Sequence, residues 1–85
     1  MTKYTFICDY NGGTYISQVK ADFLKEAILL WAKQLEWPKL SILKRKQLDK
    51  QIDDDPIPLD GIENVWCVTF RIEGKLMLIN IVETV

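Results

Sequence analysis

Residues Val65–Glu83, with the sequence VWCVTFRI-EG-KLMLINIVE, decide the fold of this chain. Two apolar runs rich in β-branched side chains flank the dipeptide Glu73-Gly74. A two-residue loop between such runs requires positive backbone φ angles, which glycine adopts at little cost. The stretch therefore predicts a β-hairpin, with strands from about Asn64 to Ile72 and from Leu76 to Val82.

A second hairpin is predicted at the other end of the chain, around Asn11-Gly12-Gly13. Apolar and polar side chains alternate from Lys3 to Tyr10, and again from Thr14 to Val19, with the period of two that is typical of strands. Because the Thr14–Val19 run is rich in polar residues, we expect it to be an edge strand or to have one face partly in water.

Two stretches with helical periodicity lie between the hairpins. The first is predicted to begin near Asp22, as N-cap, and to run to about Glu36, before Trp37-Pro38. The second is predicted from Ser41, as N-cap, to about Ile52. Basic residues near its start and acidic residues at its end oppose the helix macrodipole, so this helix should depend on tertiary packing.

These elements predict a single two-layer α+β domain of the type β-β-α-α-β-β. We expect a four-stranded, mainly antiparallel sheet with two helices on one face. The last strand is apolar on both faces, which is typical of a central strand, and the predicted order is second, first, fourth, third. The segment Pro56–Gly61 should be an extended connector, because its two prolines forbid a helix and discourage a paired central strand.

Length and composition limit the kinds of function that this protein can have. The chain has 85 residues, 48% of them hydrophobic, and a net charge of −1. That charge does not favour a dedicated nucleic-acid or anionic-membrane binder. No apolar run is long enough for a membrane span and no signal peptide is evident, so we expect a cytoplasmic protein. Cys8 and Cys67, the two cysteines, are expected to be reduced and buried.

The sequence contains no histidine, which removes the commonest proton-transfer group and most zinc sites. We therefore expect no catalytic residues, no cofactor and no metal site. One alternative is a nucleic-acid-associated protein that uses the basic helix 39–50. Another is a divalent-cation-dependent enzyme that uses the acidic segment 49–63, although its spacing does not match a calcium-binding EF-hand loop.

The favoured hypothesis is a small, non-enzymatic module that binds a protein. Apolar surface beyond the needs of one sheet–helix interface predicts a homodimer through the uncovered sheet face. An inhibitor of the immunity or antitoxin kind also fits the size and charge. The candidate partner-binding residues are aromatic side chains, which are enriched at interfaces, and the two charge clusters around the second helix. They are Tyr10, Tyr15, Trp37, Lys44, Arg45, Lys46, Asp53, Asp54 and Asp55.

Overall fold

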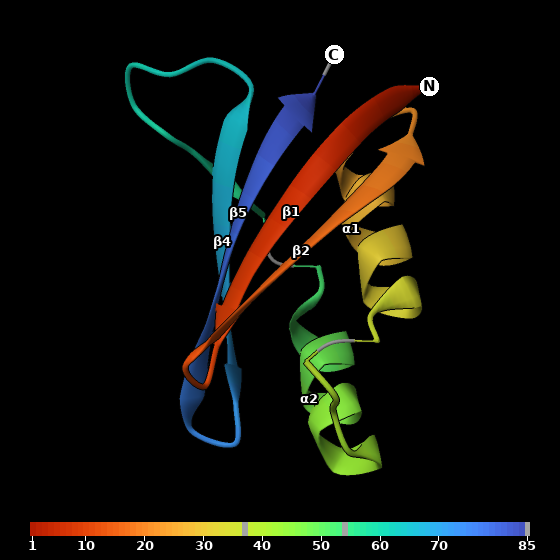
Figure 1. Cartoon of the computed structure of the whole chain (residues 1–85), viewed down its shortest axis with the longest axis vertical. Helices are drawn as coiled ribbons and strands as arrows, with labels where there is room; N and C mark the ends of the chain where they lie inside the picture. The colour runs from red at the N-terminus through yellow and green to blue at the C-terminus, as the bar shows by residue number, and fades with distance from the viewer. Residues whose placement is uncertain (37, 54, 85) are drawn as a thin grey trace.

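A computed structural model describes residues 1–36, 38–53 and 55–84 and confirms the predicted α+β class (Figure 1). The elements, in chain order, are β1 (Thr2–Tyr10), β2 (Gly13–Ala21), α1 (Leu24–Gln34), α2 (Ile42–Gln51), β3 (Ile57–Pro58), β4 (Val65–Ile72) and β5 (Lys75–Thr84). Strand β1 is one residue longer than its predicted run, and β2 and β5 are each three residues longer. Strand β4 begins one residue later than predicted.

The sheet has five strands in the order β2-β1-β5-β4-β3, and every neighbouring pair is antiparallel. The predicted order of the four long strands is confirmed. The number of strands is corrected, because Ile57 and Pro58 of the expected connector pair with Cys67 and Trp66. Proline lacks a backbone N–H, so it fits in a sheet only where that side of the strand needs no partner, as at this edge.

Both hairpins turn through two residues with positive φ. Asn11 and Gly12 have φ angles of 50° and 83°, and Glu73 and Gly74 have angles of 53° and 74°. Two successive positive values are typical of the type I′ turn, whose twist matches that of the strands it joins. In such a hairpin the residues that flank the turn form a hydrogen-bonded pair, and this fixes which residues along each strand bond to its partner.

The core lies between the sheet and the two helices, which cover the same face (Figure 1). Helix α1 packs mainly on β2 and α2 on β4. The indole of Trp31 stacks on the ring of Phe6, with 5.4 Å between ring centroids and 3° between planes. Alternate residues of β1 and β5 are buried, so the side chains on one face of each strand lie in the core. Helix α2 contributes Leu48 as its one fully buried residue.

The two helix starts differ from each other. Ser41 caps α2 as predicted, since its hydroxyl accepts a hydrogen bond of 3.2 Å from the N–H of Lys44. The predicted cap of α1 is wrong, because its N-cap is Phe23, which makes no side-chain capping bond. Asp22 instead donates its own backbone N–H to the carboxylate of Glu26, over 3.1 Å. Neither of these two helices has the length and apolar content needed to cross a bilayer.

Candidate interaction surfaces

The edge of the sheet along β4 is covered over most of its length. Strand β3 pairs with it at one end, and the N–H of Leu59 donates to the carbonyl of Val65 over 3.1 Å. At the other end of β4, the side-chain amide of Gln51 bonds to backbone groups that a neighbouring strand would otherwise pair with. Its Oε1 accepts from the N–H of Arg71 at 2.8 Å, and its Nε2 donates to the carbonyl of Arg71 at 2.7 Å.

A second glutamine of α2 continues this cover. Oε1 of Gln47 accepts from the N–H of Glu73 over 2.6 Å, and Nε2 of Gln51 also donates to the carbonyl of Gln47 over 2.9 Å. Because residues four apart lie on one side of a helix, both amides reach the same strand edge. Helix α2 is thus attached to the sheet by polar bonds to backbone as much as by the burial of Leu48.

The opposite edge, along β2, has no such cover. Gly13 and Tyr10 flank the first turn as a pair, so the odd-numbered residues of β2 bond to β1. The backbone groups of Thr14, Ile16, Gln18 and Lys20 therefore point outward. Within the described ranges no side chain or loop bonds to these groups. We call these four residues the free edge; it belongs to a nine-residue strand that contains no proline.

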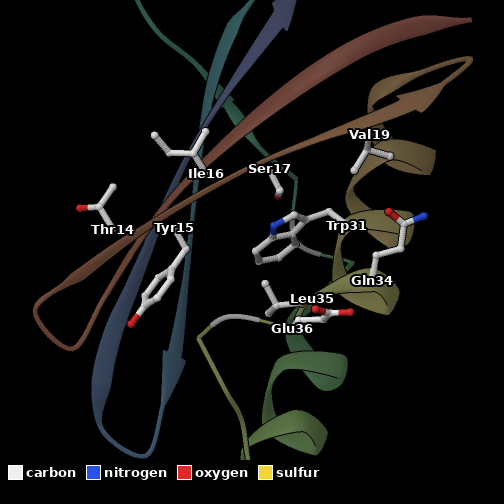
Figure 2. Close-up of a pocket in the computed structure, with 9 residues that line it drawn as sticks. All are labelled: Thr14, Tyr15, Ile16, Ser17, Val19, Trp31, Gln34, Leu35 and Glu36. Carbon is white, nitrogen blue, oxygen red and sulfur yellow. The ribbon is translucent and has the colours of Figure 1, made fainter.

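A groove of about 470 Å³ runs between the free edge and the C-terminal end of α1 (Figure 2). Tyr15, Ser17 and Val19 of β2 line it on one side, and Trp31, Gln34 and Leu35 on the other. Nε1 of Trp31 is buried and has no hydrogen-bond partner among the described residues. Figure 2 shows that nitrogen on the side of the indole ring nearer to Ser17. A buried N–H without a partner costs free energy.

The uncovered face of the sheet carries a mixed set of side chains. One row crosses all five strands through directly opposed residues: Ile16, Ile7, Asn80, Cys67 and Ile57. Ile16 and Ile57 are 67% and 69% exposed, and Leu76, on the same face, is 50% exposed.

Polar pairs interrupt the apolar surface of this face. Nε2 of Gln18 donates to Oγ1 of Thr5 over 3.1 Å, and the hydroxyls of Thr5 and Thr84 are 2.6 Å apart. The hydroxyl of Thr14 donates to the carboxylate of Asp9. The uncovered face therefore carries both apolar and polar side chains.

The predicted aromatic candidates do not lie together. Tyr15 is half-buried and lines the groove. Tyr10 lies in the core with 4% of its surface exposed, and its hydroxyl is buried without a hydrogen-bond partner in the described part of the chain. Trp37 lies outside the described residues, as does Asp54 of the acidic cluster.

Arg45, from the basic cluster, is bound within the protein. Its Nη1 donates to the carbonyl of Ala32 over 2.6 Å, and its Nη2 donates to the carbonyl of Leu35 over 3.3 Å. A guanidinium placed there satisfies carbonyls that the last turn of α1 leaves open, and its charge complements that end of the helix dipole. Lys44 is half-buried and Lys46 is exposed.

Asp53 and Asp55, from the acidic cluster, are both exposed. Nζ of Lys25 bonds to the carbonyl of Asp53 at 2.8 Å and forms an ion pair with the carboxylate of Asp55 at 3.3 Å. Among the described residues no three acidic or cysteine side chains converge as metal ligands would. Among the described residues, Arg45 thus bonds to the C-terminal end of α1, and Asp53 and Asp55 bond to Lys25 near the start of α1.

The two cysteines lie on opposite faces of the sheet. Cys8 is fully buried on the helix side, and burial, with a smaller effect from the charge of Asp9, raises the pKa of its thiol to about 12. Cys67 is half-buried on the uncovered face. Both are free thiols. The expected burial is therefore confirmed for Cys8 and wrong for Cys67, because β4 turns that side chain away from the helices.

Several residues of these surfaces were not predicted. Gln47 and Gln51 gave no local signal, because their role depends on where α2 meets β4. Trp31 also gave no local signal, because the lack of a described partner for its N–H depends on the packing around it. The free edge did have a signal in the polar content of Thr14–Val19, which favoured an edge strand.

Comparison of the chain with protein-family models, with curated proteins and with solved structures found no significant match. The function therefore has to be inferred from the surfaces described above.

Proposed function

We propose that this chain is a small, non-enzymatic, cytoplasmic protein-interaction module, and that the uncovered face of its sheet binds another protein. The observation that carries the proposal is the set of exposed apolar side chains on that face: Ile16, Ile57 and Leu76. Apolar side chains exposed on a rigid sheet are typical of contact surfaces.

The composition of the face supports a separable partner rather than a permanent one. Obligate interfaces resemble a divided core, whereas transient ones mix apolar and polar groups in about the proportion of ordinary surface. The hydrogen-bonded pairs around Thr5 and Asp9 give this face the second character. An inhibitor of the immunity or antitoxin kind, which holds a single target protein, is consistent with such a surface.

The two alternative functions have less support. Arg45 could not contribute to a nucleic-acid site on the basic helix, because its guanidinium already bonds to carbonyls at the end of α1. The nearby aspartates would also repel phosphate groups. A cation-dependent enzyme would need converging carboxylates, and those of the described acidic residues do not form such a group.

The experiment is affinity capture from the native host with three forms of the tagged protein. The Leu76→Lys, Thr69→Lys double variant places two charges on the uncovered face. The control is Ile42→Lys, which adds a charge at an apolar side chain of α2 that is 80% exposed. We expect wild type and control to retain the same protein and the double variant to lose it. Equal retention by all three forms, or no specific retention by wild type, would contradict the proposal.

A further inference from the structure

We propose that the free edge of β2 pairs with the free edge of a second copy, so that two sheets join into one continuous antiparallel sheet around a two-fold axis at Ser17. This surface is the backbone edge of β2; it borders the uncovered face at Ile16, and the rest of that face remains available to a different partner. The expectation of a homodimer is kept, but its interface moves from the sheet face to the sheet edge.

The two edges of the sheet differ in how far they are blocked. An exposed strand edge readily pairs with another strand, and proteins commonly block it with proline, with a very short strand or with covering groups. The β4 edge has all three, in Pro58, in the two residues of β3 and in the amides of Gln47 and Gln51. The β2 edge is nine residues long, and among the described residues it has none of them.

The register of β2 permits this pairing with a second copy. Outward-pointing residues of one antiparallel strand must face outward-pointing residues of the next. A two-fold axis at Ser17, the middle of β2, satisfies this rule along the whole strand. It places Thr14 opposite Lys20 of the second copy, and Ile16 opposite Gln18 of the second copy. Each of the four free-edge residues then exchanges its N–H and C=O with a partner.

The groove beside α1 would be filled in part by the second copy. In this register Ser17 of the second copy stands next to Ser17 on the helix side, in a closely spaced pair. The groove, which Trp31 lines, thereby gains a second hydroxyl beside that of Ser17. Tyr15 meets Val19 of the second copy on the same side, and this extends the apolar layer under α1.

Charges on the uncovered side of the sheet are complementary in this register. Within one chain Lys20 stands directly opposite Lys3, and like charges in that position repel. The proposed register brings Lys20 of one copy opposite Thr14 of the other, whose hydroxyl bonds to Asp9. The flexible lysine side chain can then reach the carboxylate of Asp9, and the two-fold axis repeats this pair.

The side of α1 toward the free edge fits the same arrangement. Leu30 and Gln34 are four residues apart on this flank, and Gln34 lines the groove. Phe23, at the start of α1, is 58% exposed. An axis perpendicular to the sheet leaves both α1 helices on the same face and side by side, so the flank of α1 that carries Gln34 would face the second copy.

The first test is sedimentation equilibrium of the whole protein with the variants Gln18→Pro and Gln18→Ala. Proline removes an outward N–H, which β1 does not use, so the single chain should fold. Alanine removes the same side chain and its bond to Thr5 but keeps the N–H. We expect a wild-type dimer, a similar dimer for Gln18→Ala, and a dissociation constant raised about a hundredfold for Gln18→Pro. A wild-type monomer at high micromolar concentration would overturn the proposal.

The second test examines the register and does not depend on the folding of the proline variant. Lys20→Glu faces the carboxylate of Asp9 across the interface, so it should weaken the dimer about tenfold. Combining it with Asp9→Lys restores opposite charges and should recover the affinity. Amide hydrogen exchange at Thr14, Ile16, Gln18 and Lys20 should slow as protein concentration rises. Concentration-independent exchange, or a double variant no tighter than Lys20→Glu, would show that this register is wrong.

Discussion

At the scale of single residues, Arg45 connects the two helices. Its guanidinium bonds to two carbonyls of α1 from a half-buried position on α2. Arg45→Met leaves those carbonyls without their charged donor, so we expect the free energy of unfolding to fall by about 1–3 kcal/mol. Urea denaturation measures the change as a lower transition midpoint at an unchanged slope.

The control is Lys46→Met, which removes an exposed neighbouring cation of the same cluster. A surface substitution of this kind changes stability by no more than about 0.5 kcal/mol. Arg45→Lys keeps the charge but loses the two-pronged geometry, and it should fall between the two. If Arg45→Met and Lys46→Met were equally mild, the guanidinium would contribute nothing to holding α1.

The two cysteines should differ in reactivity, again for reasons local to each residue. The reactive form of cysteine is the thiolate, and a pKa of about 12 keeps Cys8 protonated far above neutral pH. Cys67 is half-buried on the uncovered face and is more accessible. A thiol reagent at about pH 8 should therefore modify Cys67 first, as peptide mass spectrometry would show, with Cys8 modified only on unfolding. Equal rates at the two sites would contradict the burial of Cys8.

At the scale of elements, α2 should be the first to open. It buries only Leu48 fully, and three cationic or polar attachments through Arg45, Gln47 and Gln51 hold it in place. Amides of residues 42–52 should exchange faster than those of α1 and β5, since few buried contacts protect them. Exchange as slow as in β5 would mean that α2 belongs to the cooperative core.

Gln51→Ala should raise the exchange of α2 further and lower stability by about 1 kcal/mol, because both backbone groups of Arg71 lose their protein partner. Lys50→Ala is a suitable control on the same turn, since Lys50 is exposed. The difference between the two variants reports the attachment to β4, free from any effect of helix propensity.

The elements also show how far sequence reasoning reaches. Both hairpins were predictable because Asn11-Gly12 and Glu73-Gly74 are turn signals with a single sterically favoured geometry. Ser41 was predictable for a similarly local reason. Strand β3 was not, since two prolines oppose a strand locally and only its position at the sheet edge permits one. The covering role of Gln51 depends on a contact between α2 and β4 that no local pattern specifies.

At the scale of the whole molecule, the state of the two sheet edges should govern assembly. Replacing both Gln47 and Gln51 with alanine uncovers the backbone of β4 near Arg71 and Glu73. A β2 edge of one molecule could then pair with the β4 edge of the next, head to tail. We expect this double variant to form larger particles by light scattering, while Ile42→Ala, Leu43→Ala on the exposed side of α2 does not. Equal particle sizes would show that the glutamines protect nothing.

The covered β4 edge has a consequence best put in the language of polymerisation. A unit with two reactive ends propagates, whereas a unit with one reactive end is a chain terminator. In the described part of the chain, this protein has one long unblocked end, at β2, and an end at β4 that is capped over most of its length. When two molecules join through β2, each uses up the other's long unblocked end. Association of this kind stops at two whatever the concentration, and so a chain rich in apolar strands would avoid fibre growth.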